Sequence, residues 1–265
     1  MKPTGHVVDR LRYRNHSGRL IRQHRALHTI RGGAQSWLHP VLLPLLFTGL
    51  LLIGMPYITW LWGRHLEFWN GVIALRGVVH TERHWFGPRL LYEVPYLQLA
   101  ASPPDFLELS LNGILVCLLM LVSYLLLRRQ HLPLVYMVWG LCLIHASALI
   151  YFALDTDFPY DIASHTRTGL EMNIALAFLT PWILAFTYYP FAFPMATKIG
   201  ATVLLLFTLI VSAPFQYMAH AVIIYQFTLV TMPVLFIFGG LLLNVMSFVA
   251  LYGWVMSWEQ VDLSA

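Results

Sequence analysis

The second half of the chain contains histidines and carboxylates that could bind a metal. His145 and His220 lie toward the ends of two long apolar runs, and Asp157, Asp161 and His165 follow one another at spacings of four. A spacing of four places side chains on one face of a helix. Imidazole and carboxylate groups bind zinc, copper and non-haem iron. The set therefore predicts a metal site that could hold any of these ions.

A second histidine pair, His80 and His84, lies in a polar stretch nearer the N-terminus. Helices and strands both bring residues four apart to the same face, so this pair is a second metal candidate. For both sets the structural alternative is solvated loop residues, helix caps and histidines that hydrogen-bond a neighbouring helix. His145 and His220 could also be the axial ligands of a haem, because membrane haem proteins take histidines from neighbouring helices.

Several enzyme classes require motifs that the sequence lacks. It contains no GxSxG nucleophile elbow, HExxH zinc motif, Walker loop or dinucleotide fingerprint. Cys117 and Cys142 both lie inside apolar runs, which is typical of small core residues rather than nucleophiles. We therefore expect that the chain is not an enzyme on its own, with a metal-dependent oxidoreductase subunit as the alternative.

The elements that carry these residues are predicted to be transmembrane helices. Apolar residues make up 58% of the 265 residues and charged residues only 11%, a balance typical of polytopic membrane proteins. One span needs about 20 apolar residues. We predict an all-α integral membrane protein with about six transmembrane helices and a small extramembrane segment between the first and second. The predicted parts are a basic amphipathic segment at 1–36, a first span at 37–63, an outer-face segment at 64–105, a five-helix bundle at 106–256 and a tail at 257–265.

Two stretches have more complex patterns. Within the outer-face segment, Asn70-Gly71 is a typical turn pair followed by β-branched residues, which predicts a small hairpin, and residues 88–99 are expected to pack along the interface. The apolar stretch 219–256 is too long for one straight span and contains Pro233. A kinked, interfacial or re-entrant lead-in is therefore expected before the last helix.

The basic residues predict the orientation of the chain. Eight of its 16 Lys and Arg residues lie in the first 31 positions. Because cytoplasmic segments are enriched in Lys and Arg, we predict a bacterial-type inner-membrane protein with both termini in the cytoplasm and no nucleic-acid partner. The same segment has apolar residues at helical spacing, which also favours contact with lipid headgroups. The arginines expected at the lipid surface are Arg10, Arg12, Arg14, Arg19, Arg22 and Arg25.

Three features of the second half resemble the C-type membrane subunit of particulate methane and ammonia monooxygenases. They are the DTDF at Asp155–Phe158 followed by Ser164-His165, the Gln216-x3-His220 at the end of a helix, and the PVLFIFGGLLL of the last span. The resemblance implies a copper enzyme subunit whose outer-face ligands follow the patterns Asp-x3-His-x12-His and Asn-x3-His-x13-His.

The chain departs from both ligand patterns. Counting back from His165 without gaps places Phe152 and Ala148 where His and Asp are expected. A three-residue insertion would place Leu149 and His145 there instead. In the second pattern His220 matches, whereas Gln216 and Val234 replace a ligand each. The residues that could ligate a metal under this resemblance are His145, His165, Gln216 and His220.

Two functions from different classes follow from these patterns. The first is a structural or accessory subunit of a membrane complex, whose partners are lipids and other membrane subunits. The alternative is a metal-binding oxidoreductase subunit with copper, or else zinc or haem, at the outer face. A solute transporter is disfavoured, because no predicted span carries an acid or base near its middle.

Overall fold

The computed structural model describes residues 38–86, 90–127, 131–155, 158–191 and 193–257. In this part of the chain six helices are long and apolar enough to cross a membrane, and one two-stranded sheet is present. The prediction of an all-α membrane protein with about six spans is thereby confirmed. The predicted basic segment at 1–36, with its lipid-surface arginines, and nearly all of the predicted tail at 257–265 lie outside the described residues.

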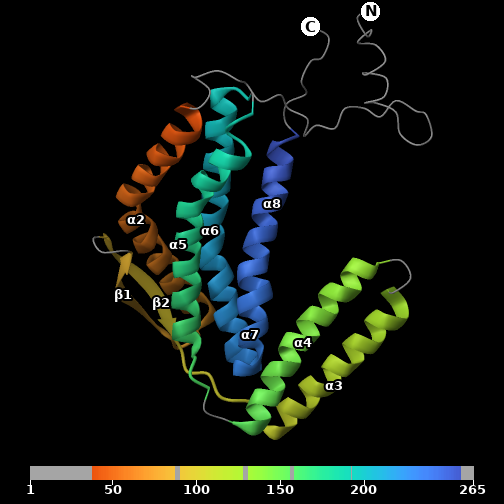
Figure 1. Cartoon of the computed structure of the whole chain (residues 1–265). Coiled ribbons are helices and arrows are strands. Elements are labelled where there is room, and N and C mark those ends of the chain that lie inside the picture. Colours follow the sequence, from red (N-terminus) through yellow and green to blue (C-terminus); the bar gives the residue numbers. More distant parts are fainter. Residues whose placement is uncertain (1–37, 87–89, 128–130, 156–157, 192, 258–265) are drawn as a thin grey trace, which may run out of the picture.

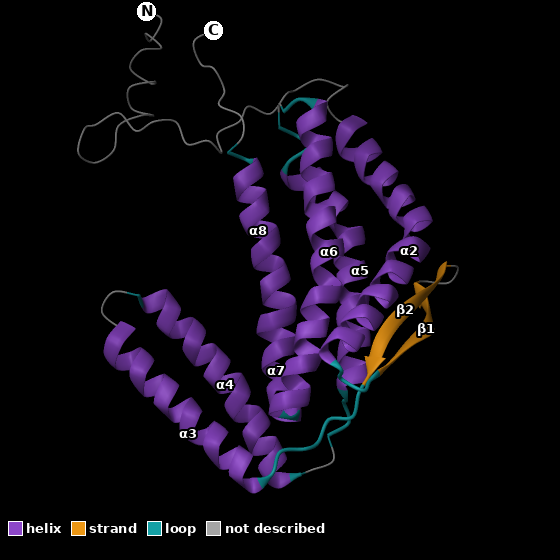
Figure 2. Ribbon diagram, turned by 180° about the vertical axis from the view of Figure 1, so that it is seen from behind, coloured by secondary structure: helices purple, strands orange, loops and turns teal. Residues whose placement is uncertain are grey.

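The helices form two groups (Figures 1 and 2). Four of them, α2, α5, α6 and α8, run side by side, whereas α3 and α4 form a separate antiparallel pair that diverges from α8. The helices are α2 (Leu38–Ile73), α3 (Phe106–Val122), α4 (Leu132–Leu154), α5 (Ile162–Thr187), α6 (Met195–Phe227), α7 (Met232–Val234) and α8 (Leu243–Val255). The strands are β1 (Val78–Phe86) and β2 (Leu90–Gln98). The start of α2 and the end of α8 lie at the same end of the molecule.

The first helix is longer than predicted, because α2 continues past residue 63 to Ile73. Asn70 and Gly71 lie inside this helix, so the prediction of a hairpin turn at this pair is wrong. The Asn70 side chain instead binds the link to β1, donating to the carbonyl of Gly77 at 2.8 Å and accepting from its amide at 3.3 Å. This side chain therefore fixes the link between α2 and β1 to the last turn of the helix.

The hairpin forms further along, where β1 pairs antiparallel with β2 from Val78↔Gln98 to Phe86↔Leu90. The segment expected to lie along the interface is therefore a strand. Its buried residues Tyr92, Val94 and Leu97 face the helices, and β2 contacts both α2 and α5. Burial and the carboxylate of Glu171 raise the pKa of Tyr92, so this phenol stays protonated further into the alkaline range than a free tyrosine.

Thr166 anchors the hairpin to α5. Its hydroxyl donates to the carbonyl of Ile162 at 2.8 Å and accepts from the amide of Leu97 at 3.3 Å. Leu97 and Thr166 are both 0% exposed, so this amide has no access to water. On the exposed side, Arg167 forms an ion pair with Glu82 of β1 at 2.5 Å. The hairpin is thus fixed to the start of α5 by one buried and one exposed contact.

Replacing Thr166 with valine is expected to loosen the hairpin. The substitution keeps the shape of the side chain but leaves the buried amide of Leu97 unpaired, which costs about 1–3 kcal/mol. Hydrogen exchange of residues 92–98 should become faster. A Thr187→Val variant is the matched control, because this exposed hydroxyl bonds only within its own helix. Equal protection of residues 92–98 in both variants would contradict the anchor.

The last apolar stretch is divided at Thr228. Residues up to Phe227 complete α6, and Thr228 then adopts a φ of 64° that ends the helix. A short 3-10 turn η3 (Leu229–Thr231) and α7 lead into a π-helical segment, η4 (Leu235–Leu242), which continues as α8. The expected lead-in at 219–232 is thus partly the end of α6 and partly a tight reversal. This reversal returns η4 against the end of α6.

Candidate functional site

The structure brings together two of the predicted metal ligands, His165 and His220. His165 lies in the first turn of α5, and His220 lies near the end of the antiparallel α6. The Nε2 of His165 and the Nδ1 of His220 are 3.1 Å apart, and each residue is only 4% exposed. A hydrogen bond between two imidazoles needs one donor and one acceptor. The site is therefore a buried, hydrogen-bonded histidine pair.

Asp161 positions His165 through the backbone, because its carbonyl accepts a hydrogen bond from the amide of His165 at 3.0 Å. It is the N-cap of α5, where its Oδ1 accepts from the amide of Ser164 at 2.7 Å. The Ser164 hydroxyl is in turn 2.9 Å from the Asp161 amide, so the two residues form a reciprocal capping box. This cap fixes the first turn and thereby the direction of the next side chain, His165. The structure thus gives Asp161 the role of a helix cap, which was the alternative to metal binding.

Two glycines allow the helices to approach the histidine pair closely. A Cβ atom at Gly169 of α5 would lie 1.9 Å from the ring of Tyr217, and one at Gly239 of η4 would lie 2.6 Å from Nε2 of His220. No side chain fits at either distance. Gln216 adds a polar link, because its Nε2 donates to the carbonyl of Gly239. The π-helical segment therefore packs directly on the end of α6, as is typical of small residues between membrane helices.

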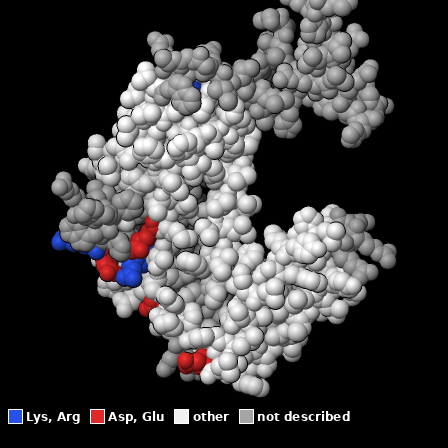
Figure 3. All heavy atoms as spheres, in the orientation of Figure 1, with Lys and Arg blue, Asp and Glu red and all other residues white. Residues whose placement is uncertain are grey.

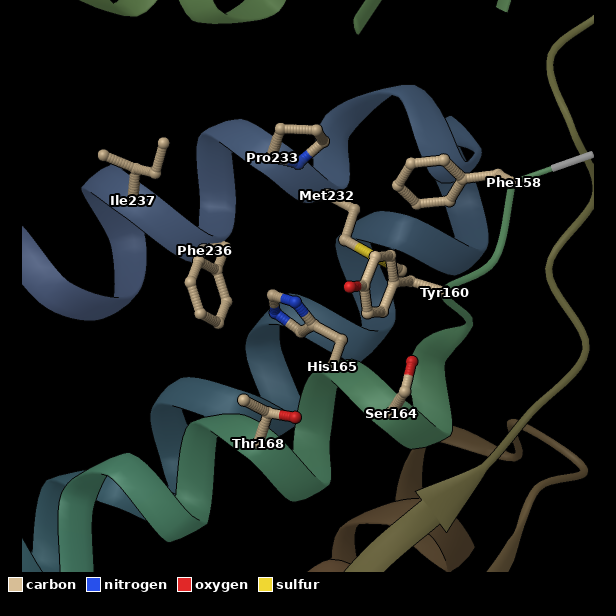
Figure 4. Close-up of a pocket in the computed structure, with 9 residues that line it drawn as sticks. All are labelled: Phe158, Tyr160, Ser164, His165, Thr168, Met232, Pro233, Phe236 and Ile237. Carbon is tan, nitrogen blue, oxygen red and sulfur yellow. The ribbon is translucent and has the colours of Figure 1, made fainter. Parts of the chain in front are cut away.

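A pocket of about 360 Å³ opens beside His165, between the start of α5 and the turn that leads into η4 (Figure 4). Among the described residues, no charged side chain lines it. In Figure 4 the imidazole of His165 lies between the rings of Phe236 and Tyr160. The lining residues are Phe158, Tyr160, Ser164, His165, Thr168, Met232, Pro233, Phe236 and Ile237.

The other predicted ligands do not join this pair. His145 of α4 is hydrogen-bonded to Asn112 of α3, with 3.1 Å between Nε2 and Oδ1. His80 is exposed on β1 and its ring lies against Tyr96 on the neighbouring strand. Asp157 and the side chain of His84 lie outside the described part of the chain. Among the described residues no group of three or more His, Cys, Asp or Glu side chains could hold a metal ion.

The histidine pair fits part of a metal site. With metal–nitrogen distances of about 2.0–2.1 Å, two nitrogens 3.1 Å apart subtend an angle of roughly 100° at the ion, close to tetrahedral. The pair could therefore supply two ligands to copper or zinc once the shared proton has moved to the other nitrogen of its own ring. Further His, Cys, Asp or Glu ligands would have to come from beyond the described residues or from another chain.

Several residues of the site were missed in the sequence. Tyr217 packs against the histidine pair with its ring centroid 5.2 Å from that of His220. Asn173 is 1% exposed, and its Oδ1 has no hydrogen-bond partner among the described residues. The detectable signal was the spacing of His165, Gly169 and Asn173 at intervals of four, which aligns them on one face of the helix.

Comparison of the chain with protein-family models, curated proteins and solved structures gives no match. The resemblance to the C-type monooxygenase subunit therefore depends only on the sequence features quoted above.

Proposed function

We propose that this polytopic membrane protein is a structural or accessory subunit of a complex in a bacterial-type inner membrane, with both termini in the cytoplasm. The observation that supports it is the separation of α3 and α4 from the other helices. These two helices, with the π-helical turn η2 (Ser123–Leu127) between them, are called the arm below. Both described ends of the chain lie at one end of the molecule, as an even number of spans requires.

The arm is held together internally but has few contacts with the rest of the protein. Asn112 binds His145 across the pair, and the indole of Trp139 donates to Ser123 at 3.1 Å. Outside the pair, α4 packs chiefly on η3 and α7, at one end of the arm. Val116 is the one buried residue described in α3. Figure 3 shows an open, uncharged hollow between the arm and α8.

Membrane helices associate through close packing and hydrogen bonds, because lipid provides no hydrophobic driving force between them. A helix pair that packs on its own protein chiefly at one end, with a further contact between Gly140 and Phe238, has packing surface left for another subunit. Gly113 of α3 is part of that surface, since nothing lies within 4 Å of the position its Cβ would occupy. A partner helix could approach the backbone closely there.

A specific observation favours the second function, a metal-binding oxidoreductase subunit. His165 and His220 lie close enough to share one ion, beside a pocket that could admit a small substrate. Copper suits this reading best, because imidazole ligands and the sequence resemblance both point to it. In this function the remaining ligands would include Asp157 or a residue of a partner subunit.

Native mass spectrometry of the protein extracted from its own membranes tests both functions. We expect stoichiometric partner subunits, which a Gly113→Leu variant loses because the added side chain blocks close approach. Gly200→Leu is the matched control, since Gly200 also has nothing within 4 Å of its Cβ position. A protein that carries no partner would contradict the accessory role. A bound copper or zinc mass that disappears in a His165→Ala, His220→Ala variant would favour the second function.

A further inference from the structure

The pocket beside His165 has the lining of a site for a small, uncharged and mainly apolar molecule. Aromatic and aliphatic side chains form most of its wall, and no charged side chain of the described residues takes part. An ion that entered would lose hydration without gaining a counter-charge, which is costly. Its volume of about 360 Å³ is within the usual range for small-molecule sites.

The buried imidazole in this wall has one ring nitrogen that bonds to none of the described residues. His165 is 4% exposed, and its Nε2 is already bound to His220. Its other ring nitrogen, Nδ1, has no hydrogen bond among the described residues. This nitrogen is not completely buried. Nδ1 is therefore accessible from the pocket. A buried nitrogen of this kind gains free energy when a ligand atom pairs with it.

The histidine pair leaves Nδ1 able to serve either as donor or as acceptor. When the Nε2–H group of His165 donates the hydrogen bond to His220, the Nδ1 of His165 carries a lone pair and accepts from a hydroxyl. When His220 holds the shared proton, the Nδ1 of His165 carries a hydrogen and donates to a carbonyl. Both states are neutral overall, so the pair can match a carbonyl or a hydroxyl oxygen without a change of charge.

The rings around this nitrogen favour a flat ligand that reaches the pocket from the membrane. The ring centroids of Phe236 and His165 are 6.0 Å apart, and the angle between the ring planes is 64°. This edge-to-face arrangement leaves aromatic faces for stacking. Figure 4 places Tyr160 on the opposite side of the imidazole. Ile237, at the edge of the pocket on η4, is 39% exposed on the apolar lateral surface. The pocket is thus reached through the lipid-facing side of the last span.

We propose that this pocket binds a membrane-dissolved quinone or phenol, with the ligand oxygen at Nδ1 of His165 and its ring against Phe236. This site is a binding activity beyond the accessory role proposed above, and it does not depend on that role or on a bound metal.

The test uses the full-length protein in phospholipid nanodiscs, with menadione as the quinone probe and methylnaphthalene as its oxygen-free match. Retained ligand is measured after gel filtration and corrected with empty nanodiscs. We expect saturable, stoichiometric retention of menadione, and about tenfold weaker retention of methylnaphthalene because it lacks the hydrogen bond. Equal retention of the two compounds, or menadione retention no greater than that of empty nanodiscs, would overturn the proposal.

Two variants assign the retained ligand to this pocket. His165→Phe keeps a ring but removes Nδ1, and should weaken menadione binding about tenfold. His65→Phe is the matched control, because His65 lies on α2 against Phe215, away from the pocket. Thr168→Phe changes an exposed side chain that lines the pocket, and should fill the cavity and reduce retention even if His165→Phe does not fold. Wild-type retention by either folded variant would overturn the assignment.

Discussion

Replacing Gly169 with alanine is expected to destabilise the protein more than any other single methyl group added to these helices. The new Cβ would lie 1.9 Å from a ring carbon of Tyr217, which is 1% exposed and cannot move into solvent. Either the ring must leave its position or α5 must separate from α6. Overpacking of this kind costs about 3 kcal/mol, at the upper end of its usual range.

The unfolding of this variant can be followed with a thiol-reactive dye. The dye is read at a cysteine that replaces Ala213, which is 0% exposed on α6, after Cys117 and Cys142 have been replaced by alanine. The control is Gly200→Ala, a helix position with nothing within 4 Å, which should be neutral or stabilise by up to about 1 kcal/mol. Shortening Tyr217 to leucine should restore part of the stability of Gly169→Ala. Identical unfolding temperatures for the two alanine variants would show that α5 and α6 are not in such close contact.

The second large effect concerns the histidine pair, and its sign depends on how many partners are replaced. His220→Leu leaves the buried Nε2 of His165 without its partner, which costs about 1–3 kcal/mol. Replacing both histidines with leucine removes both polar groups, so the double variant should be no less stable than the His220→Leu single variant. An unpaired buried polar group loses its hydrogen bonds to water and gains none in the protein. Two buried leucines carry no polar group and therefore have no such cost.

A double-mutant cycle in the same dye assay measures this coupling. The four proteins are the wild type, His165→Leu, His220→Leu and the double variant, all with the reporter cysteine at Ala213 and without Cys117 and Cys142. We expect a coupling free energy of about 1–2 kcal/mol, as found for residues in direct contact. The matched cycle on His145 and Asn112 of the arm is read at Cys142 after Cys117→Ser, and it should show coupling for the same reason, because these side chains are 3.1 Å apart. Strict additivity at His165 and His220 would show that the two rings do not interact.

Much of the fold was predictable because it depends on short-range patterns. Long apolar runs predict spans, and the cap at Asp161 is marked by a residue type that favours helix starts. The end of α2 was misplaced because Asn70-Gly71 has strong turn propensity, whereas in the structure the Asn70 side chain fixes the link to β1 to the last turn of the helix. The end of α6 at Thr228 had no sequence signal, since Pro233 lies beyond it.

The sequence by itself determined that this is a polytopic membrane protein, that its ionisable residues gather near span ends, and that His165 and His220 were candidates for one site. Only the tertiary structure decided that these two meet, since they are separated by 55 positions, and that His145 pairs with Asn112 instead. Hydropathy and helical period are local properties, so they can be read along the chain. The meeting of two rings depends on how closely the helices approach, and that distance is set by Gly169 and Gly239 against side chains from elsewhere in the chain.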